Sequence, residues 1–111
     1  MGSSPQTLLD AIHGREIAQA DNSDVDVAAA FAYGRFVGSA GLRRLTFQER
    51  GRMLKALALH LMSEKAKFYP ISAHTGATKS DSWVDIEGGI GTLFAYASLR
   101  KQLPDLPYLI D

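Results

Sequence analysis

The stretch of residues 72–99 constrains the fold most, because it combines a turn, a helix start and an apolar helical repeat. Gly76 is expected to end one helix with a positive φ angle. The hydroxyls that can begin the next helix belong to Thr78, Ser80 and Ser82, and Asp81 and Asp85 lie near its positive end. Apolar residues then recur at helical spacing, at Val84, Ile86, Ile90, Leu93, Phe94 and Ala97. The stretch therefore predicts a turn followed by an amphipathic helix.

Glycines interrupt this predicted helix at Gly88, Gly89 and Gly91. Each costs about 1 kcal/mol of helix stability relative to alanine. The G-x-G order is similar to the start of a dinucleotide-binding loop, but no predicted strand precedes it and Phe94 stands where the third glycine belongs. The glycines are instead interpreted as a smooth helix face against which another backbone or a bulky ligand packs closely.

A second helix is predicted over residues 47–62, because Thr46 and Glu49 have the spacing of a capping box. Apolar residues follow at helical spacing, at Met53, Leu54, Leu57, Ala58, Leu61 and Met62. A further helical stretch runs from residue 63 to about residue 74. Pro70 lies within it and is expected to kink or split that helix, since proline lacks a backbone N–H.

The N-terminal part predicts a short β-hairpin over residues 7–20, with Gly14 in the turn. A polar cluster at residues 21–24 precedes a helix that begins at Val25 and is expected to end near Gly38 or Gly41. Residues 42–45 are interpreted as a connector, and residues 103–111 as an extended tail. The predicted fold is mainly α, with three to four amphipathic helices and a possible short N-terminal β-hairpin.

Composition excludes several classes of function. Twelve basic and twelve acidic residues balance, so no nucleic-acid or anionic membrane partner is expected. The absence of cysteine excludes disulfides, thiolate metal sites and a cysteine nucleophile, and it suits a reducing cytoplasm. No apolar run approaches the roughly 20 residues of a membrane span. Residues 1–6 do not have the pattern of a signal peptide and are expected to be a disordered leader, either native or left from an expression leader.

The candidate chemical groups are few. His13, His60 and His74 are spread over different predicted elements, without a partner at metal-ligand spacing, so no metal site is predicted. Ser72 lies near His74, but the G-x-S-x-G motif of a serine nucleophile is absent. Three acids near one helix start, Asp81, Asp85 and Glu87, either form an acid/base pair or act as cap and dipole partners. Cap and dipole roles explain the three acids best.

Several segments together are similar to a known family. They read LTFQER, LMSEKAKFY, HTGATKSDSWVDIEGGIGTLFAYASL and LPD, with IHGREIAQAD and DVDVAAAFAYGR upstream. The chain resembles the N-terminal part of the aldehyde dehydrogenase family. The branch that it resembles is the one in which bacterial phenylacetate degradation fuses a semialdehyde dehydrogenase to a ring-opening hydratase. The resemblance implies that residues 7–111 are an incomplete, helical piece of the α/β cofactor domain.

The same resemblance implies what this piece lacks. In the family the attacking cysteine, the oxyanion-binding asparagine, the water-activating glutamate and the residues that grip NAD or NADP all come from later segments. No catalytic, cofactor-binding or metal-binding residue is therefore expected in this chain, and the chain alone is expected to be inactive. One weaker role carries over: Val84 and Gly88 match positions at the mouth of the substrate tunnel. Glycine at position 88 would widen that mouth for a CoA-linked semialdehyde.

Other interpretations remain open. The chain could act alone as a small helical interaction or oligomerisation module, or it could be the equivalent piece of a semialdehyde dehydrogenase from the CoA-epoxide route of benzoate breakdown. As a detached piece, the chain would carry helices whose apolar faces are shaped for a cofactor domain that is absent. Because exposed apolar faces drive association, a homo-oligomer is predicted, formed by exchange of the N-terminal arm or of the C-terminal tail.

Overall fold

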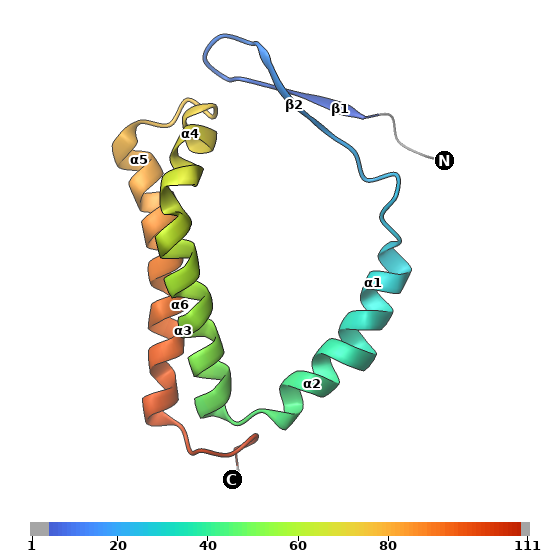
Figure 1. Cartoon of the computed structure of the whole chain (residues 1–111), viewed down its shortest axis with the longest axis vertical. Helices are drawn as coiled ribbons and strands as arrows, with labels where there is room; N and C mark the ends of the chain where they lie inside the picture. The colour runs from blue at the N-terminus through green and yellow to red at the C-terminus, as the bar shows by residue number, and fades with distance from the viewer. Residues whose placement is uncertain (1–4, 110–111) are drawn as a thin grey trace.

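A computed structural model describes residues 5–109 of the chain, and it is mainly helical with one two-stranded antiparallel sheet at the N-terminal end (Figure 1). The predicted fold class is confirmed. Residues 1–4 of the predicted leader lie outside the described residues, as do residues 110 and 111. Gln6, which was assigned to the leader, is the first residue of a strand.

The predicted hairpin is formed by β1 (Gln6–Leu9) and β2 (Glu16–Ala20), which pair with Gln6 opposite Ala20. Gly14 has a φ of 65° in the connecting turn, as its predicted turn role requires. Every residue of both strands is exposed. Because two isolated strands are only marginally stable in water, contacts at the hairpin's turn end must help to hold it.

The next elements form one continuous helical arm of α1 (Val27–Tyr33), the π-helical turn η1 (Gly34–Gly38) and α2 (Ser39–Arg44). The Asp26 side chain caps α1 by accepting from the backbone N–H of Ala29 at 2.8 Å. The prediction that the helix ends near Gly38 or Gly41 was wrong, as was a connector at residues 42–45. Gly38 has the right-handed φ of −62°, and the helix ends only before Leu45. Glycine ends a helix through its positive φ, and neither of these glycines adopts one.

The predicted capping box starts α3 (Phe47–Glu64), which ends two residues beyond the predicted boundary. The Thr46 backbone donates to Glu49 Oε2 at 2.8 Å, and the Glu49 backbone donates to Thr46 Oγ1 at 3.2 Å. A 3₁₀ turn, η2 (Lys65–Lys67), then leads into α4 (Phe68–Ala73). Pro70 lies in the first turn of α4, where its missing N–H would have no helical partner. The helix is therefore interrupted at η2, before Pro70, and not at the proline itself.

Gly76, with a φ of 83°, separates α4 from a second long helix. This helix consists of α5 (Lys79–Trp83), the π-helical turn η3 (Val84–Gly88), α6 (Gly89–Ser98) and the 3₁₀ turn η4 (Leu99–Gln102). Among the candidate hydroxyls, Thr78 is the cap that begins it, in a second capping box with Asp81. Figure 1 shows α6 running antiparallel to α3, side by side with it.

The core lies between α3 and α6 and is built from small residues. Ala58 is fully buried, Ala97 is 1% exposed and Ile90 is 6% exposed. Gly51 is also buried, and a Cβ placed on it would lie 2.7 Å from Arg100 Cδ and 3.1 Å from the Ala97 carbonyl oxygen. Because glycine has no side chain here, the two helices approach closely at this point.

The tail after α6 folds back onto the start of α3. Gln48 Nε2 donates to the carbonyls of Arg100 at 2.6 Å and Leu103 at 3.2 Å. Arg50 Nη2 donates to the Pro107 carbonyl at 2.8 Å. The tail is a run of bends over residues 105–108 and not the predicted extended segment. These bonds hold it against the helical hairpin.

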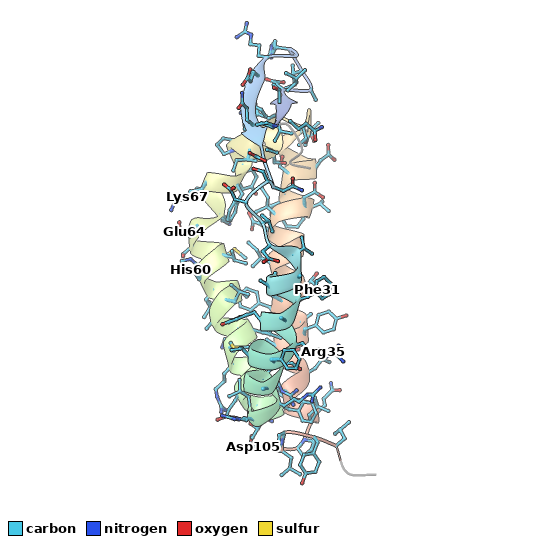
Figure 2. The ribbon with its side chains drawn as sticks, turned by 90° about the vertical axis from the view of Figure 1, so that its right-hand side faces the viewer. Phe31, Arg35, His60, Glu64, Lys67 and Asp105 are labelled. Carbon is cyan, nitrogen blue, oxygen red and sulfur yellow. The ribbon has the colours of Figure 1, made fainter. Side chains whose placement is uncertain are left out.

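The overall shape is open. The radius of gyration is 18.8 Å, against about 13 Å for a compact domain of this length. The α1–α2 arm diverges from the helical hairpin (Figure 1). Seen from the side of the arm, Phe31 and Arg35 project into solvent (Figure 2). Many large apolar side chains are exposed, and Phe31 at 77% and Phe36 at 73% are the extreme cases. The described residues therefore leave apolar helix faces uncovered.

Candidate functional site

The two predicted tunnel-lining residues, Val84 and Gly88, are the first and last residues of the π-helical turn η3. Val84 is 57% exposed, and a Cβ added to Gly88 would meet no atom within 4 Å. The same open space surrounds Gly89 and Gly91. Within residues 5–109 no other segment lies within 4 Å of a Cβ added at these glycines, and the close helix approach occurs at Gly51 instead. The lining role of Val84 and Gly88 stays a prediction.

Glu87 lies on the same turn and joins it to the other long helix. Its Oε1 accepts from the Tyr69 hydroxyl at 2.9 Å and lies 3.0 Å from Lys65 Nζ. The pKa of the Glu87 carboxyl lies below its usual value. The largest cause is the hydrogen bond with Lys65, and Tyr69 and Trp83 contribute less. Burial and the neighbouring Glu87 raise the pKa of Tyr69.

The sequence interpretation gave Glu87 a cap or dipole role, and the structure gives it a different one. Only Asp81 of the three acids caps this helix, through its side-chain bonds to Thr78. Glu87 instead bridges to Lys65 in η2 and Tyr69 in α4, which the sequence places far from it. No local spacing rule links these three residues, so the cluster was not predicted.

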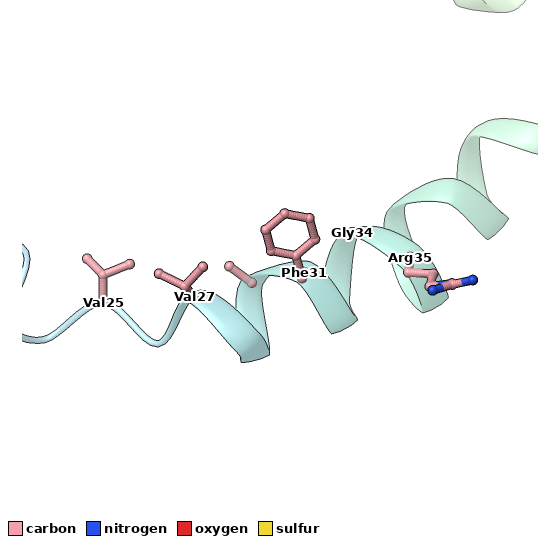
Figure 3. A pocket seen from close by; sticks show the side chains of 6 residues that line it. Val25, Val27, Phe31, Gly34 and Arg35 are labelled. Atoms are coloured by element: carbon pink, nitrogen blue, oxygen red, sulfur yellow. The ribbon is translucent and has the colours of Figure 1, made fainter.

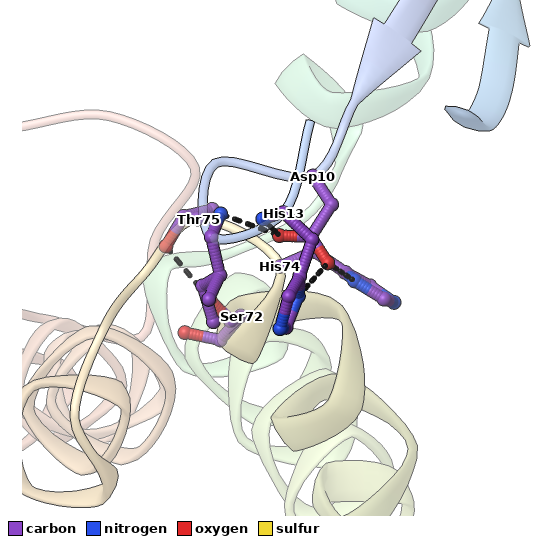
Figure 4. A network of polar contacts seen from close by, with 6 residues as sticks. Asp10, His13, Ser72, His74 and Thr75 are labelled. Atoms are coloured by element: carbon purple, nitrogen blue, oxygen red, sulfur yellow. Dashed lines mark hydrogen bonds and ion pairs between the residues drawn. The ribbon is translucent and has the colours of Figure 1, made fainter. Parts of the chain in front are cut away.

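A second polar cluster joins the hairpin to the end of α4 (Figure 4). Asp10 Oδ2 lies 3.5 Å from Nδ1 of both His13 and His74. The backbone N–H of Ala11 donates to the His74 carbonyl at 2.9 Å. The pKa of the Asp10 carboxyl is lowered mainly by the hydrogen bond from the backbone N–H of Ile12. Hydrogen bonds from His13 and His74 lower it further. This cluster fastens the turn end of the hairpin.

The two histidines therefore have a carboxylate partner that sequence spacing did not reveal. The cluster is still no metal site: among residues 5–109 no group of three or more histidine, cysteine or acidic side chains could hold a metal ion. His74 is also not the partner of the candidate nucleophile Ser72. The Ser72 hydroxyl lies 2.8 Å from the hydroxyl of the buried Ser82 and ties α4 to α5. These contacts give Ser72 a structural role.

The arm carries an open apolar pocket, lined by Val25, Val27, Ala30, Phe31, Gly34 and Arg35 (Figure 3). All six residues come from one continuous segment, so the pocket is a helix face and not a cleft between elements. A small molecule there would be covered from one side only, whereas ligand sites bury most of the ligand's surface. The face suits packing against polypeptide.

Comparison with known proteins gives one informative relationship. The chain is 35% identical over 97 residues to 3,4-dehydroadipyl-CoA semialdehyde dehydrogenase from Aromatoleum evansii. The match covers 86% of this chain but only 19% of that protein, so the chain spans about a fifth of its relative's length. No family model matches the chain. Among the described residues, no helix is both long and apolar enough to cross a membrane.

Proposed function

We propose that the chain is the N-terminal part of an aldehyde dehydrogenase that oxidises a CoA-linked semialdehyde to the acid with NAD or NADP, in the catabolism of aromatic compounds. The similarity to a CoA-semialdehyde dehydrogenase over 97 residues carries this proposal. The arrangement of the described residues agrees with it. They leave apolar helix faces uncovered that a cofactor domain would cover. The chain by itself is inactive in this proposal.

In this proposal the contribution of the chain to the substrate site is the face of η3. Val84 and Gly88 line the mouth of the tunnel, and the open space at Gly88 admits the long CoA-linked substrate. Gly88→Leu in the complete enzyme should raise the KM for the CoA substrate and leave the KM for the nicotinamide cofactor unchanged. Gly89→Leu is the matched control, since Gly89 is equally open but has no lining role. An unchanged KM in Gly88→Leu refutes the lining role.

The reading frame beyond Asp111 and an activity assay test the proposal directly. A frame that continues into a cofactor-binding domain with a catalytic cysteine supports it, and a natural stop codon contradicts it. The protein that carries this segment should form NADH or NADPH when given a CoA-linked semialdehyde, and the 111-residue chain should not. Turnover of an aldehyde by the chain alone would overturn the assignment. Two substrates, the semialdehyde of the phenylacetate route and 3,4-dehydroadipyl-CoA semialdehyde, should be compared in the same assay.

A second candidate function is a stand-alone helical oligomerisation module. The uncovered apolar face around Phe31 favours it, because such a face associates readily in water. Light scattering at rising protein concentration should then show a homo-oligomer, which Phe31→Asp should dissociate. A monodisperse monomer at high concentration contradicts self-association. If the chain forms an oligomer and the source DNA has a natural stop codon after Asp111, the module is favoured over the dehydrogenase.

A further inference from the structure

We propose that Glu87 is a positioning residue, anchored by Lys65 and Tyr69, that fixes the π-helical turn η3 and thereby sets the direction of the Val84 side chain and the placement of Gly88 at the substrate entrance. The inference rests on the proposed function for the entrance itself. Its structural part concerns only the residues that the structure describes.

The first step is the geometry of the anchor. A single carboxylate oxygen of Glu87 receives both the Tyr69 hydroxyl at 2.9 Å and the Lys65 ammonium at 3.0 Å. The Glu87 side chain is 20% exposed, so water competes with these donors less than at an open surface. Hydrogen bonds that involve charged groups are shorter and stronger than neutral ones. The anchor therefore fixes the carboxylate at one point.

The second step is where the anchor holds the helix. Glu87 is the fourth of the five residues of η3, directly before Gly88. Lys65 lies in the 3₁₀ turn η2 and Tyr69 one turn later in α4, so the anchor joins the irregular segment η2 to the irregular segment η3. Lys65 and Tyr69 both lie on the first long helix, so the anchor ties η3 to that helix across the hairpin.

The third step is why the turn needs an anchor. A π-turn inserts a residue into an α-helix, and such turns occur frequently at functional sites. A regular α-helix is the preferred alternative for the same residues, and a shift to it would rotate the residues on one side of the turn relative to those on the other, which changes the placement of Val84 relative to Gly88. Val84 is 57% exposed, and a Cβ added at Gly88 would meet nothing within 4 Å beyond the helix's own backbone. Among the described residues, the polar side-chain contacts that join η3 to the other long helix are those of Glu87, and these contacts oppose the shift.

The structural part is tested in the chain with Glu87→Gln, Tyr69→Phe and Lys65→Met. Each variant should show faster hydrogen exchange in a peptide covering residues 79–92 and a changed emission of Trp83, the single tryptophan. Lys65→Arg keeps the charge and should behave as the unmodified chain does. Asp85→Asn removes an exposed carboxylate from the same turn and serves as the matched control. Unchanged exchange and emission in all three variants would overturn the anchor, provided that circular dichroism shows intact helices.

The functional part is tested in the protein that carries this segment. Glu87→Gln and Tyr69→Phe should raise the KM for the CoA-linked semialdehyde about tenfold, equivalent to about 1.4 kcal/mol of substrate binding, with kcat and the cofactor KM changed little. Loss of a contact that only stabilises the fold would not raise the KM for the CoA-linked semialdehyde while leaving the KM for the cofactor unchanged. If the unmodified enzyme oxidises the substrate and the variants keep its KM, the entrance role is wrong and the proposed function stands. If the unmodified enzyme oxidises no CoA-linked semialdehyde, the proposed function and the entrance role both fail, while the exchange experiment still decides the anchor.

Discussion

The close helix approach at Gly51 yields a prediction whose sign distinguishes packing from helix propensity. Alanine at an open helical position gains about 1 kcal/mol over glycine. At Gly51 the added Cβ would lie 2.7 Å from Arg100 Cδ, 2.8 Å from Arg100 Cβ and 3.1 Å from the Ala97 carbonyl oxygen. Arg100 Cβ is next to the backbone, and the Arg100 carbonyl is held by Gln48. The helices must therefore separate for Gly51→Ala to fit.

Overpacking of this kind costs about 1–3 kcal/mol. After the gain in helix propensity, Gly51→Ala should lower the free energy of unfolding by about 1 kcal/mol, whereas Gly89→Ala, which meets nothing within 4 Å, should raise it by about 1 kcal/mol. Thermal unfolding followed by circular dichroism measures both, and 1 kcal/mol shifts the Tm of a domain of this size by about 4–8 °C. Equal stabilisation by the two substitutions would refute the close approach of α3 and α6.

Three further predictions concern the ends of elements. Thr46→Ala should lower the unfolding free energy by about 1 kcal/mol through loss of the α3 cap, as measured by urea denaturation. The lowered pKa of Asp10 means that its bonds stabilise the fold above the carboxyl's ordinary pKa of 3.8 and are lost as the pH falls through the lowered value. The protection of the hairpin amides, taken as their exchange rate relative to the intrinsic rate at the same pH, should therefore fall at acid pH. Asp10→Asn should show low protection at every pH and so abolish this pH dependence. Gln48→Ala removes one bond to Arg100 in η4 and one to Leu103 in the tail, and it should speed hydrogen exchange over residues 103–109 without changing helix content. Unaltered exchange there would show that the tail is held by other contacts.

The local sequence determined the elements whose signals lie within a few residues of each other. The capping box at Thr46, the positive φ of Gly76 and the turn at Gly14 are all confirmed, because each depends on bonds or backbone angles of adjacent residues. The mainly helical class follows from the same signals combined with apolar periodicity. Gly38 shows the limit of this reasoning, since a glycine in a sequence does not reveal the sign of its own φ.

The tertiary structure alone decided which residues meet across the helical hairpin. The approach at Gly51, the bonds of Lys65 and Tyr69 to Glu87, and the pairing of Asp10 with His74 join segments whose separation no local rule encodes. Such contacts depend on the relative rotation and spacing of two helices, and these are set by how the small core residues pack. The sequence by itself therefore determined where helices start and turn, and packing determined which faces were buried and which were left open.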